Sequence, residues 1–440
     1  MTDLPAASDV ARLFSLHAIW QSYLDVEAAM ALEQGALGMI PQAAAEEIAA
    51  KAHLDVITAD ALAADIAVTR APIASIARVL SAACSPEAAG YVHWGGTTQN
   101  IQQTGRTLLQ KQAHAALMAR LGRVIAGFCD MAEATAAIPA VSRTNHRQAL
   151  PITFGFKIAA VIEELERHAE RLREAEKRVF TSQMGGAVAA MHAWGEKGPA
   201  LNEAVSRRLG LVHMHIPART AADHIAEYAL LLALLGTSID RWVSEIYLLM
   251  GDEFGELIED LGAGVIGSST MPHKINSKLA VKIIADASRL RAMTGPAFDA
   301  MRSTNESDSA TNHLIYDTQS KPVTLAYEML CDLDALIPAI RLFPDGMRRN
   351  LDLTGGLIAA ENVMMMLAPK LGRTHAHDLV HHAAAVAVAE RIPFIEALMM
   401  DGEISGAATR EELELATDAA NYTGLSELLT RETVKAARGK

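Results

Sequence analysis

One segment near residue 270 combines groups that can bind and polarise an anion. Residues 267–276 read GSSTMPHKIN, so a glycine and hydroxyl residues precede Lys274 and Asn276. Such a segment has backbone N–H groups free to bind an anion. Pro272 can begin the next helix, whose N-terminus attracts negative charge as well. The pattern predicts an anion-binding loop, although a flexible loop with a serine-rich helix cap fits the composition equally well.

Two other polar segments have a similar character. Residues 92–100 read VHWGGTTQN, and residues 142–148 read SRTNHRQ, with Pro151 shortly after. Both are rich in small or polar residues, and each stands at the expected end of a helix. Thr97 and Thr98 are of a residue type that caps helix N-termini. The sequence therefore predicts three polar loops at helix ends.

The apolar residues between these loops follow the helical period. Stripes of apolar residues at helical spacing run through residues 108–134, 157–179, 224–261 and 279–293. The stripe in 157–179 consists of Ile158, Val161, Ile162, Leu165, Ala169, Leu172 and Val179. Long helices of this kind need partners along their whole length, which favours a bundle. Since 50% of the residues are hydrophobic but only 5% aromatic, we predict an all-α fold.

The length of 440 residues exceeds what one compact core usually spans. We predict three helical domains. Residues 1–106 form an N-terminal domain with the first polar loop. Residues 107–350 form a central long-helix bundle with the second and third loops. Residues 351–440 form a C-terminal domain of shorter helices separated by glycines.

Charge and hydropathy exclude several classes of partner. The net charge is −13 and no basic run is visible, so nucleic acid is not an expected partner. The longest apolar stretch, residues 228–240, is far shorter than the ~20 residues that span a bilayer. The first residues contain no apolar signal core. We expect a cytoplasmic protein without membrane contact.

Neither the cysteines nor a group of histidines near residue 380 indicates a metal site. The 3 cysteines are far apart in the sequence and are expected to be reduced thiols. His377 and His381 have the i, i+4 spacing of helical metal ligands, but no Glu or Cys completes a set. We therefore expect surface histidines at positions 375, 377, 381 and 382, and no metal.

The motifs resemble those of one enzyme group. GSSTMPHKIN is similar to the GSSxMPxKxN signature of the fumarase/aspartase superfamily. VHWGGTTQNIQQTG resembles the HWGATSQDxxDT stretch of 3-carboxy-cis,cis-muconate cycloisomerases and its adenylosuccinate lyase equivalent. SRTNHRQALPITFGFKIA resembles the cycloisomerase segment GRTxxQQALPITFG. Residues 24–41, 183–198 and 350–377 also look like this branch, so the likeness covers nearly the whole chain.

This resemblance implies both an assembly and a reaction. It implies a homotetramer built on a 20-helix core, with each active site assembled from loops of three subunits. The reaction would be cofactor-free elimination from a small dicarboxylate or tricarboxylate of the substituted-succinate type. By resemblance Ser268 is the base, acting as an alkoxide, and Ser269 is the alternative. An ordinary serine hydroxyl is too weakly acidic to ionise unaided, so nearby positive charge and N–H donors must support it.

The resemblance also supplies a set of site residues. Lys274, Asn276 and the backbone of residues 267–270 would receive the charge that develops on the substrate carboxylate. For Arg143, which the resemblance places among the substrate-binding residues, a structural ion pair is the alternative role. Candidate substrate-binding residues are Thr97, Thr98, Asn100, Arg143, Thr144, Asn145, Gln148, Ser269, Thr270 and Met271.

The chain departs from the family pattern at the position of the general acid. Asn145 stands where many relatives have an acid histidine, and an asparagine cannot protonate a leaving group. His146 and His93 are the remaining candidate acids, and a structural hydrogen bond would explain His93 equally well. A poor acid disfavours loss of hydroxide, whereas an amine or a carboxylate leaves more readily.

Other departures concern charge and the start of a helix. Asn100 and Gln103 replace the usual Asp residues, which removes two negative charges. This change suits a substrate richer in carboxylates or one without a cationic amine. Ser277 stands where most members have proline, so the following helix is expected to begin differently.

The sequence thus predicts a lyase and leaves its substrate open. The leading hypothesis is a C–N lyase that releases fumarate from an N-substituted aspartate. The alternative is a 3-carboxy-cis,cis-muconate cycloisomerase of aromatic catabolism. A third possibility, from another class, is a catalytically silent, crystallin-like structural protein. The presence of Ser268, Lys274 and Asn276 together argues against silence.

Overall fold

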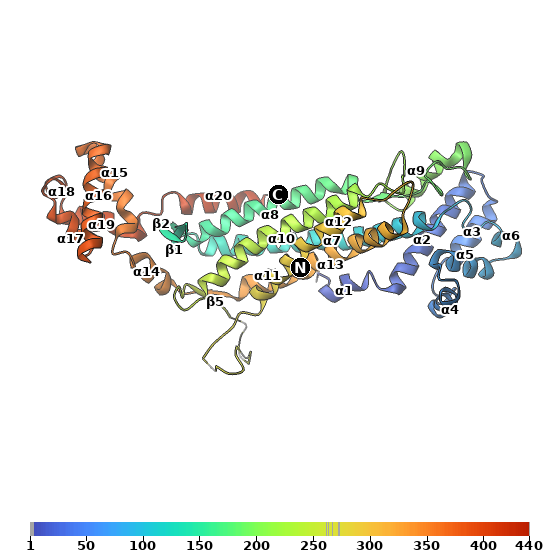
Figure 1. Cartoon of the computed structure of the whole chain (residues 1–440), viewed down its shortest axis with the longest axis horizontal. Coiled ribbons are helices and arrows are strands. Elements are labelled where there is room, and N and C mark those ends of the chain that lie inside the picture. The colour runs from blue at the N-terminus through green and yellow to red at the C-terminus, as the bar shows by residue number, and fades with distance from the viewer. Residues whose placement is uncertain (1–3, 261, 263, 266, 272, 440) are drawn as a thin grey trace. The chain divides into compact units, whose positions relative to one another are not determined.

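Helices make up most of the chain. The computed structural model describes residues 4–260, 262, 264–265, 267–271 and 273–439. Within this part, the few strands form three two-stranded sheets (Figure 1). The predicted all-α fold is confirmed.

The chain divides into two compact units, each built from three separate stretches. Unit 1 comprises Met1–Gly122, Arg167–Ile239 and Ala285–Asp332. Unit 2 comprises Arg123–Glu166, Asp240–Ile284 and Leu333–Lys440. The division into three domains at residues 106 and 350 stays a prediction.

Helices also fill the first part of unit 1. They are α1 (Ala7–Arg12), α2 (Leu16–Ala36), α3 (Gln42–Lys51), α4 (Ala59–Thr69), α5 (Pro72–Ala83) and α6 (Pro86–Ala89). The Ser15 hydroxyl accepts a hydrogen bond from the Ala18 N–H at 3.3 Å and so caps α2. Tyr23, Leu24 and Ile76 are almost fully buried in the core that these helices share. This core carries the first polar loop.

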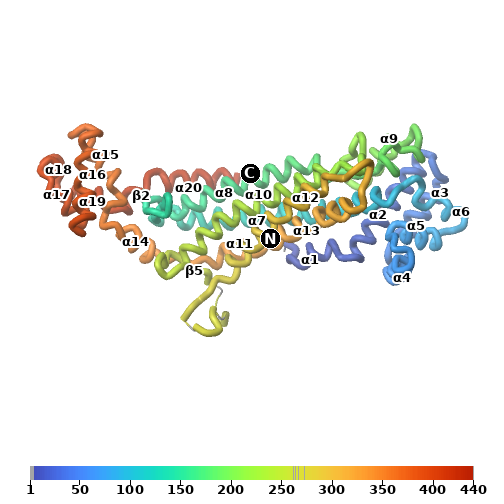
Figure 2. Tube along the Cα trace, in the orientation of Figure 1, coloured from blue at the N-terminus to red at the C-terminus, as the bar shows by residue number. Residues whose placement is uncertain are grey.

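The long helices follow the predicted apolar stripes. They are α7 (Thr98–Ala134), α8 (Phe154–Val179), α10 (Asp223–Leu249), α11 (Leu279–Ala292) and α13 (Ser309–Ala339). Every residue of the stripe predicted in α8 is at most 3% exposed. Within unit 1, α7 lies beside α10, where His114 bonds Tyr228 at 3.0 Å, and beside α13, where Gln319 bonds Thr107 at 2.9 Å (Figure 2). Shorter helices α9 (Gly198–Arg208) and α12 (Thr294–Ala300) connect them.

One predicted stripe extends too far. The pattern from 224 to 261 predicted helix throughout, but α10 ends at Leu249. Gly255 then adopts a φ of +54°, a conformation that glycine tolerates easily. The chain continues as strand β5 (Leu257–Glu259), which pairs antiparallel with β6 (Ile340–Leu342). The apolar residues of this segment are thus shared between a helix and a strand.

The C-terminal helices of unit 2 have a core of their own. They are α14 (Pro344–Asp352), α15 (Ala360–Leu371), α16 (Arg373–Glu390), α17 (Phe394–Met400), α18 (Gly402–Ala407), α19 (Arg410–Thr417) and α20 (Ser426–Arg438). Val363, Phe394 and Leu413 are fully buried in the core of α15–α19. Among the described residues no single helix is long and apolar enough to cross a bilayer, and one bent pair, Pro344–Asp352 with Leu357–Leu371, qualifies by length and composition.

Candidate active site

The third loop holds the Ser268 hydroxyl between backbone N–H groups. Its Oγ accepts hydrogen bonds from the N–H of Thr270 at 3.3 Å and of Met271 at 3.0 Å. Donors aimed at an oxygen stabilise negative charge on it, so this arrangement favours the alkoxide form. Ser269 is exposed, and its hydroxyl makes no hydrogen bond within the described part of the chain. Of the two serines, only Ser268 has its hydroxyl supported by backbone N–H groups among the described residues.

The two ends of this loop are fastened to each other. The side-chain amide of Asn276 donates to the Gly267 carbonyl at 2.9 Å, and the Lys274 N–H donates to the Met271 carbonyl at 3.0 Å. A Cβ at Gly267 would lie 2.6 Å from the Cα of Ile275, so a larger residue does not fit. The Lys274 side chain is exposed and forms no ion pair among the described residues. Asn276 thus positions the loop, while Lys274 offers a free positive charge.

The helix after this loop begins where its predicted apolar stripe begins, several residues after Pro272. Pro272 lies outside the described residues, and α11 starts at Leu279. The carboxylate of Glu259 accepts from the N–H groups of Lys278 at 2.9 Å, Leu279 at 2.8 Å and Ala280 at 3.1 Å. The Ser277 hydroxyl donates to the same carboxylate. The negative charge at this N-terminus is therefore a carboxylate of the protein itself.

Replacing Glu259 by glutamine is expected to destabilise the fold by about 1–3 kcal/mol, because an amide nitrogen would face donors in a buried cap. Urea denaturation of both proteins measures this difference. Glu253→Gln, at an exposed position of the same stretch, is the control and should leave the midpoint unchanged. Equal midpoints for Glu259→Gln and the native chain would contradict the assigned cap.

The second loop is a β-hairpin. Strand β1 (Pro139–Thr144) pairs antiparallel with β2 (Arg147–Thr153), and the pair ends at Thr144 opposite Arg147. Asn145 and His146 form the turn with φ values of +50° and +61°, the conformation of a two-residue hairpin turn. Both are exposed, so the candidate acid His146 lies at the hairpin tip, in contact with solvent.

Two candidate residues of this hairpin are engaged by the protein itself. Arg143 forms an ion pair with Glu256 at 2.5 Å and stacks over the Phe254 ring. The Gln148 amide donates to the Asn350 carbonyl at 2.6 Å. For Arg143 the geometry supports the structural alternative. Thr144 remains exposed at the end of β1, available to a substrate.

The first loop leads into helix α7. Thr97 precedes the helix, and its N–H donates to the Asn100 side-chain oxygen at 3.1 Å. Thr98 is the first residue of α7 and is exposed. The Asn100 amide donates to the Gln183 carbonyl at 2.7 Å and is fully buried. Asn100 therefore supports the loop from behind, and the threonines are the residues that a ligand can reach.

His93, the other candidate acid, is paired with a buried glutamate that sequence analysis missed. Its Nδ1 lies 2.6 Å from Oε1 of Glu27, whose side chain is 1% exposed. Burial alone would lower the pKa of His93, but the charge and hydrogen bond of Glu27 outweigh it, so the pKa is raised above its usual value. Glu27 lies 66 residues away along the chain, so only the fold brings the two together.

This pair makes the stability depend on pH. Because folding raises the pKa of His93, the pair stabilises fully below the unfolded value of about 6.5, and this stabilisation is lost as pH rises through the folded value. Glu27→Gln is expected to lower the titration midpoint of His93, measured by NMR, and to destabilise the protein more at low than at high pH. Glu33→Gln on the same helix is the control. An unchanged His93 midpoint in Glu27→Gln would contradict the pairing.

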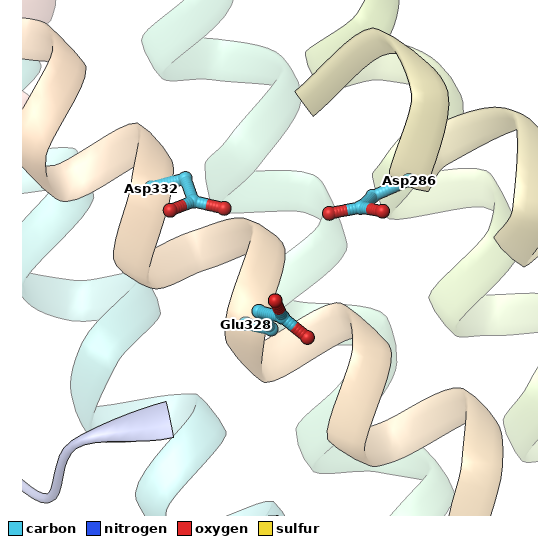
Figure 3. Close-up of side chains that lie close together, drawn as sticks. All are labelled: Asp286, Glu328 and Asp332. Carbon is cyan, nitrogen blue, oxygen red and sulfur yellow. The ribbon is translucent and has the colours of Figure 1, made fainter. Parts of the chain in front are cut away.

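Other clusters of titratable groups lie outside these loops. Asp286 of α11 and Glu328 and Asp332 of α13 direct their carboxylates toward one another, with oxygens within 4.8 Å (Figure 3). Asp286 also pairs with Arg289 at 2.6 Å, and we assign the cluster no part in the reaction. The histidines of α16 at positions 375, 377, 381 and 382 are exposed, as predicted, and His375 bonds Glu403 at 2.8 Å.

Comparison with known proteins decides the family. The model of the family described as "Lyase" matches residues 15–285, and that described as "Adenylosuccinate lyase C-terminus" matches residues 356–433. The chain belongs to the fumarase/aspartase superfamily. As a member of this superfamily it is a lyase, and the predicted family and enzyme class are confirmed.

The relatives of this lyase are named for several different reactions. It is 34% identical to trans-aconitate decarboxylase 1 of Mycosarcoma maydis, over 96% of this chain and 89% of that protein. It is 33% identical to 3-carboxy-cis,cis-muconate cycloisomerase of Pseudomonas aeruginosa, over 96% and 95% of the two chains. The crystal structure of fumarate lyase from Mesorhizobium sp. BNC1 superposes with a TM-score of 0.90 at 30% identity, covering 99% of each chain.

Proposed function

We propose that this lyase catalyses cofactor-free anti β-elimination from a substituted succinate. The leading reaction is C–N cleavage of an N-substituted aspartate with release of fumarate. The observation that supports it best is the Ser268 hydroxyl, which accepts two backbone N–H hydrogen bonds. Two comparisons agree with this reaction. One similar structure is named a fumarate lyase, and residues 356–433 match the adenylosuccinate lyase C-terminus.

The third loop accounts for the difficult step. Removing a proton beside a carboxylate places a second negative charge on that carboxylate, which is far uphill in water. Ser268 takes the proton as an alkoxide. Lys274 and the N–H groups of the loop stabilise the charge that develops, and preorganised donors of this kind typically contribute several kcal/mol. Asn276 holds the loop in this shape through its bond to Gly267.

The leaving group follows from the acids present. Asn145 has no proton to give, and His146 is exposed at the hairpin tip. His93 stays protonated to higher pH than an ordinary histidine because of Glu27, so it is the better candidate acid. An amine needs one proton to leave as a neutral molecule, which a single histidine of this kind can supply.

The alternative function is a 3-carboxy-cis,cis-muconate cycloisomerase, favoured by the relative of that name. In that reaction a carboxylate of the substrate closes a lactone ring, and in the reverse direction it leaves with little help from an acid. The presence of Ser268, Lys274 and Asn276 together argues against the silent, crystallin-like alternative, as does membership in a family of lyases.

Direct assays separate these reactions. The purified chain is incubated with N-substituted aspartates, 3-carboxymuconate and trans-aconitate, each followed in the ultraviolet. Formation of fumarate from an aspartate derivative is the expected result. Turnover of 3-carboxymuconate alone would establish the cycloisomerase instead. Loss of carbon dioxide from trans-aconitate would contradict both proposed reactions and indicate a decarboxylase.

We further propose a homotetramer with shared active sites. Large apolar side chains remain exposed on several helices of this chain, among them Leu234 and Leu248 of α10, Phe298 of α12, and Leu425 and Leu428 of the last helix region. A second copy that covers them would bury apolar surface, at roughly 25 cal/mol per Å². Sedimentation at micromolar concentration is expected to show a tetramer. A monomer under these conditions would refute the assembly.

A further inference from the structure

An arginine of unit 1 lies directly against the helix that begins at the first loop. The Arg219 Nε donates to the Gln99 side-chain oxygen at 2.7 Å, and its Nη1 donates to the Ala187 carbonyl at 2.7 Å. The Gln99 amide donates back to the Arg219 carbonyl, also at 2.7 Å. Gln99 directly follows the candidate substrate-binding residue Thr98. Arg219 is thus held against the residue that follows Thr98 in the sequence.

Within the described part of the chain, no carboxylate forms an ion pair with this arginine. Arg219 is half-buried, and its recorded partners are an amide and a carbonyl, with no ion pair to any described residue. Its Nη2 makes no hydrogen bond within the described part of the chain. Burial lowers the pKa of Arg219 and outweighs the opposite effect of Tyr316. A partly desolvated guanidinium with free donors is a binding site for an anion, and its planar fork fits a carboxylate.

The described residues of the network around the Arg219 guanidinium are uncharged and do not neutralise its positive charge. The Gln99 amide also donates to the Gln103 side chain at 3.0 Å, and both glutamines are buried. Ser307 donates to the oxygen of Gln99 that Arg219 contacts, at 3.1 Å. Among the described residues, the network that holds the guanidinium therefore contains amides, a backbone carbonyl and a hydroxyl, and no acid.

We propose that Arg219 binds an anionic group of the substrate beyond the two carboxylates of its succinyl part. Arg219 is then a specificity-determining residue, and the preferred substrates carry at least three carboxylates. This inference rests on the proposed function, because it places the succinyl group beside Thr97 and Thr98.

Binding of unreactive acids tests this preference without turnover. Calorimetry compares 2-(carboxymethyl)succinate with 2-ethylsuccinate, which has the same succinyl part and lacks the third carboxylate. The native chain should bind the tricarboxylate about 10- to 100-fold more tightly, the range for a hydrogen bond to a charged group. Arg219→Gln should lose this preference and bind 2-ethylsuccinate as before. Arg207→Gln, an exposed arginine of the same unit, should keep it.

A second variant protects the test against misfolding. Gln99→Glu places a carboxylate against Arg219, so it should also abolish the preference while the guanidinium stays in place. Equal affinity of the native chain for both acids, or equal loss of both in Arg219→Gln, would overturn the inference. The elimination assays decide the proposed function separately, because a lyase without this preference would still release fumarate from N-substituted aspartates.

Discussion

Replacing Ser268 by alanine is expected to lower kcat by about 10²- to 10⁴-fold, the usual contribution of a positioned acid or base. Substrate should still bind nearly normally, because Lys274 and the backbone N–H groups of the loop remain. The hydroxyl that accepts from Thr270 and Met271 is the group that is lost. The defect should therefore lie in proton removal and not in affinity.

Isotope exchange distinguishes this defect from a general loss of activity. In deuterated solvent the native enzyme should exchange the C3 proton of its substrate, and Ser268→Ala should not. Ser269→Ala is the matched control and should keep measurable exchange, since its hydroxyl is exposed and unsupported by backbone donors. Near-native turnover and exchange in Ser268→Ala would place the base elsewhere, with His146 the next residue to test.

Replacing Lys274 by alanine is expected to lower kcat by about 10²- to 10³-fold, because one preorganised donor to the developing dianion is removed. The fold should be unaffected, since this side chain is exposed and forms no ion pair among the described residues. The effect should appear in kcat more than in KM, because the charge it stabilises is greatest in the transition state.

The control for this variant is a lysine of the same segment. Lys278 is exposed, and only its backbone N–H takes part in the helix cap. Lys278→Ala should therefore retain native kcat. Steady-state kinetics of both variants, with circular dichroism to verify folding, provide the comparison. An unchanged turnover number in Lys274→Ala would refute its assigned role.

The sequence predicted the long helices because their apolar period is local information. The stripe from Ile158 to Val179 is buried as expected. The hairpin of the second loop was missed, although a local signal exists: Asn145 is of a residue type that accepts a positive φ, and extended residues flank it. The likeness to family motifs located this segment in the sequence but did not predict its secondary structure.

Other features depend on contacts that no local pattern contains. Glu259 caps α11 from 20 residues before Leu279, and Glu27 pairs with His93 from 66 residues away. Arg219 meets Gln99 across 120 residues. Side chains such as these lie in segments with unremarkable composition. Their roles follow from the three-dimensional fold, of which the sequence predicted only the all-α class and the long helices.

The two compact units are interleaved along the chain, and this has a consequence for how the protein can be made. Their boundaries fall inside helices α7, α8, α10, α11 and α13, so neither unit corresponds to one continuous fragment. On the ribosome, unit 1 lacks its last stretch until residue 332 has been synthesised. Ser307 reaches Gln99 across 208 residues, so the surroundings of the first loop mature late. Nascent chains must keep their apolar stripes from aggregating until then.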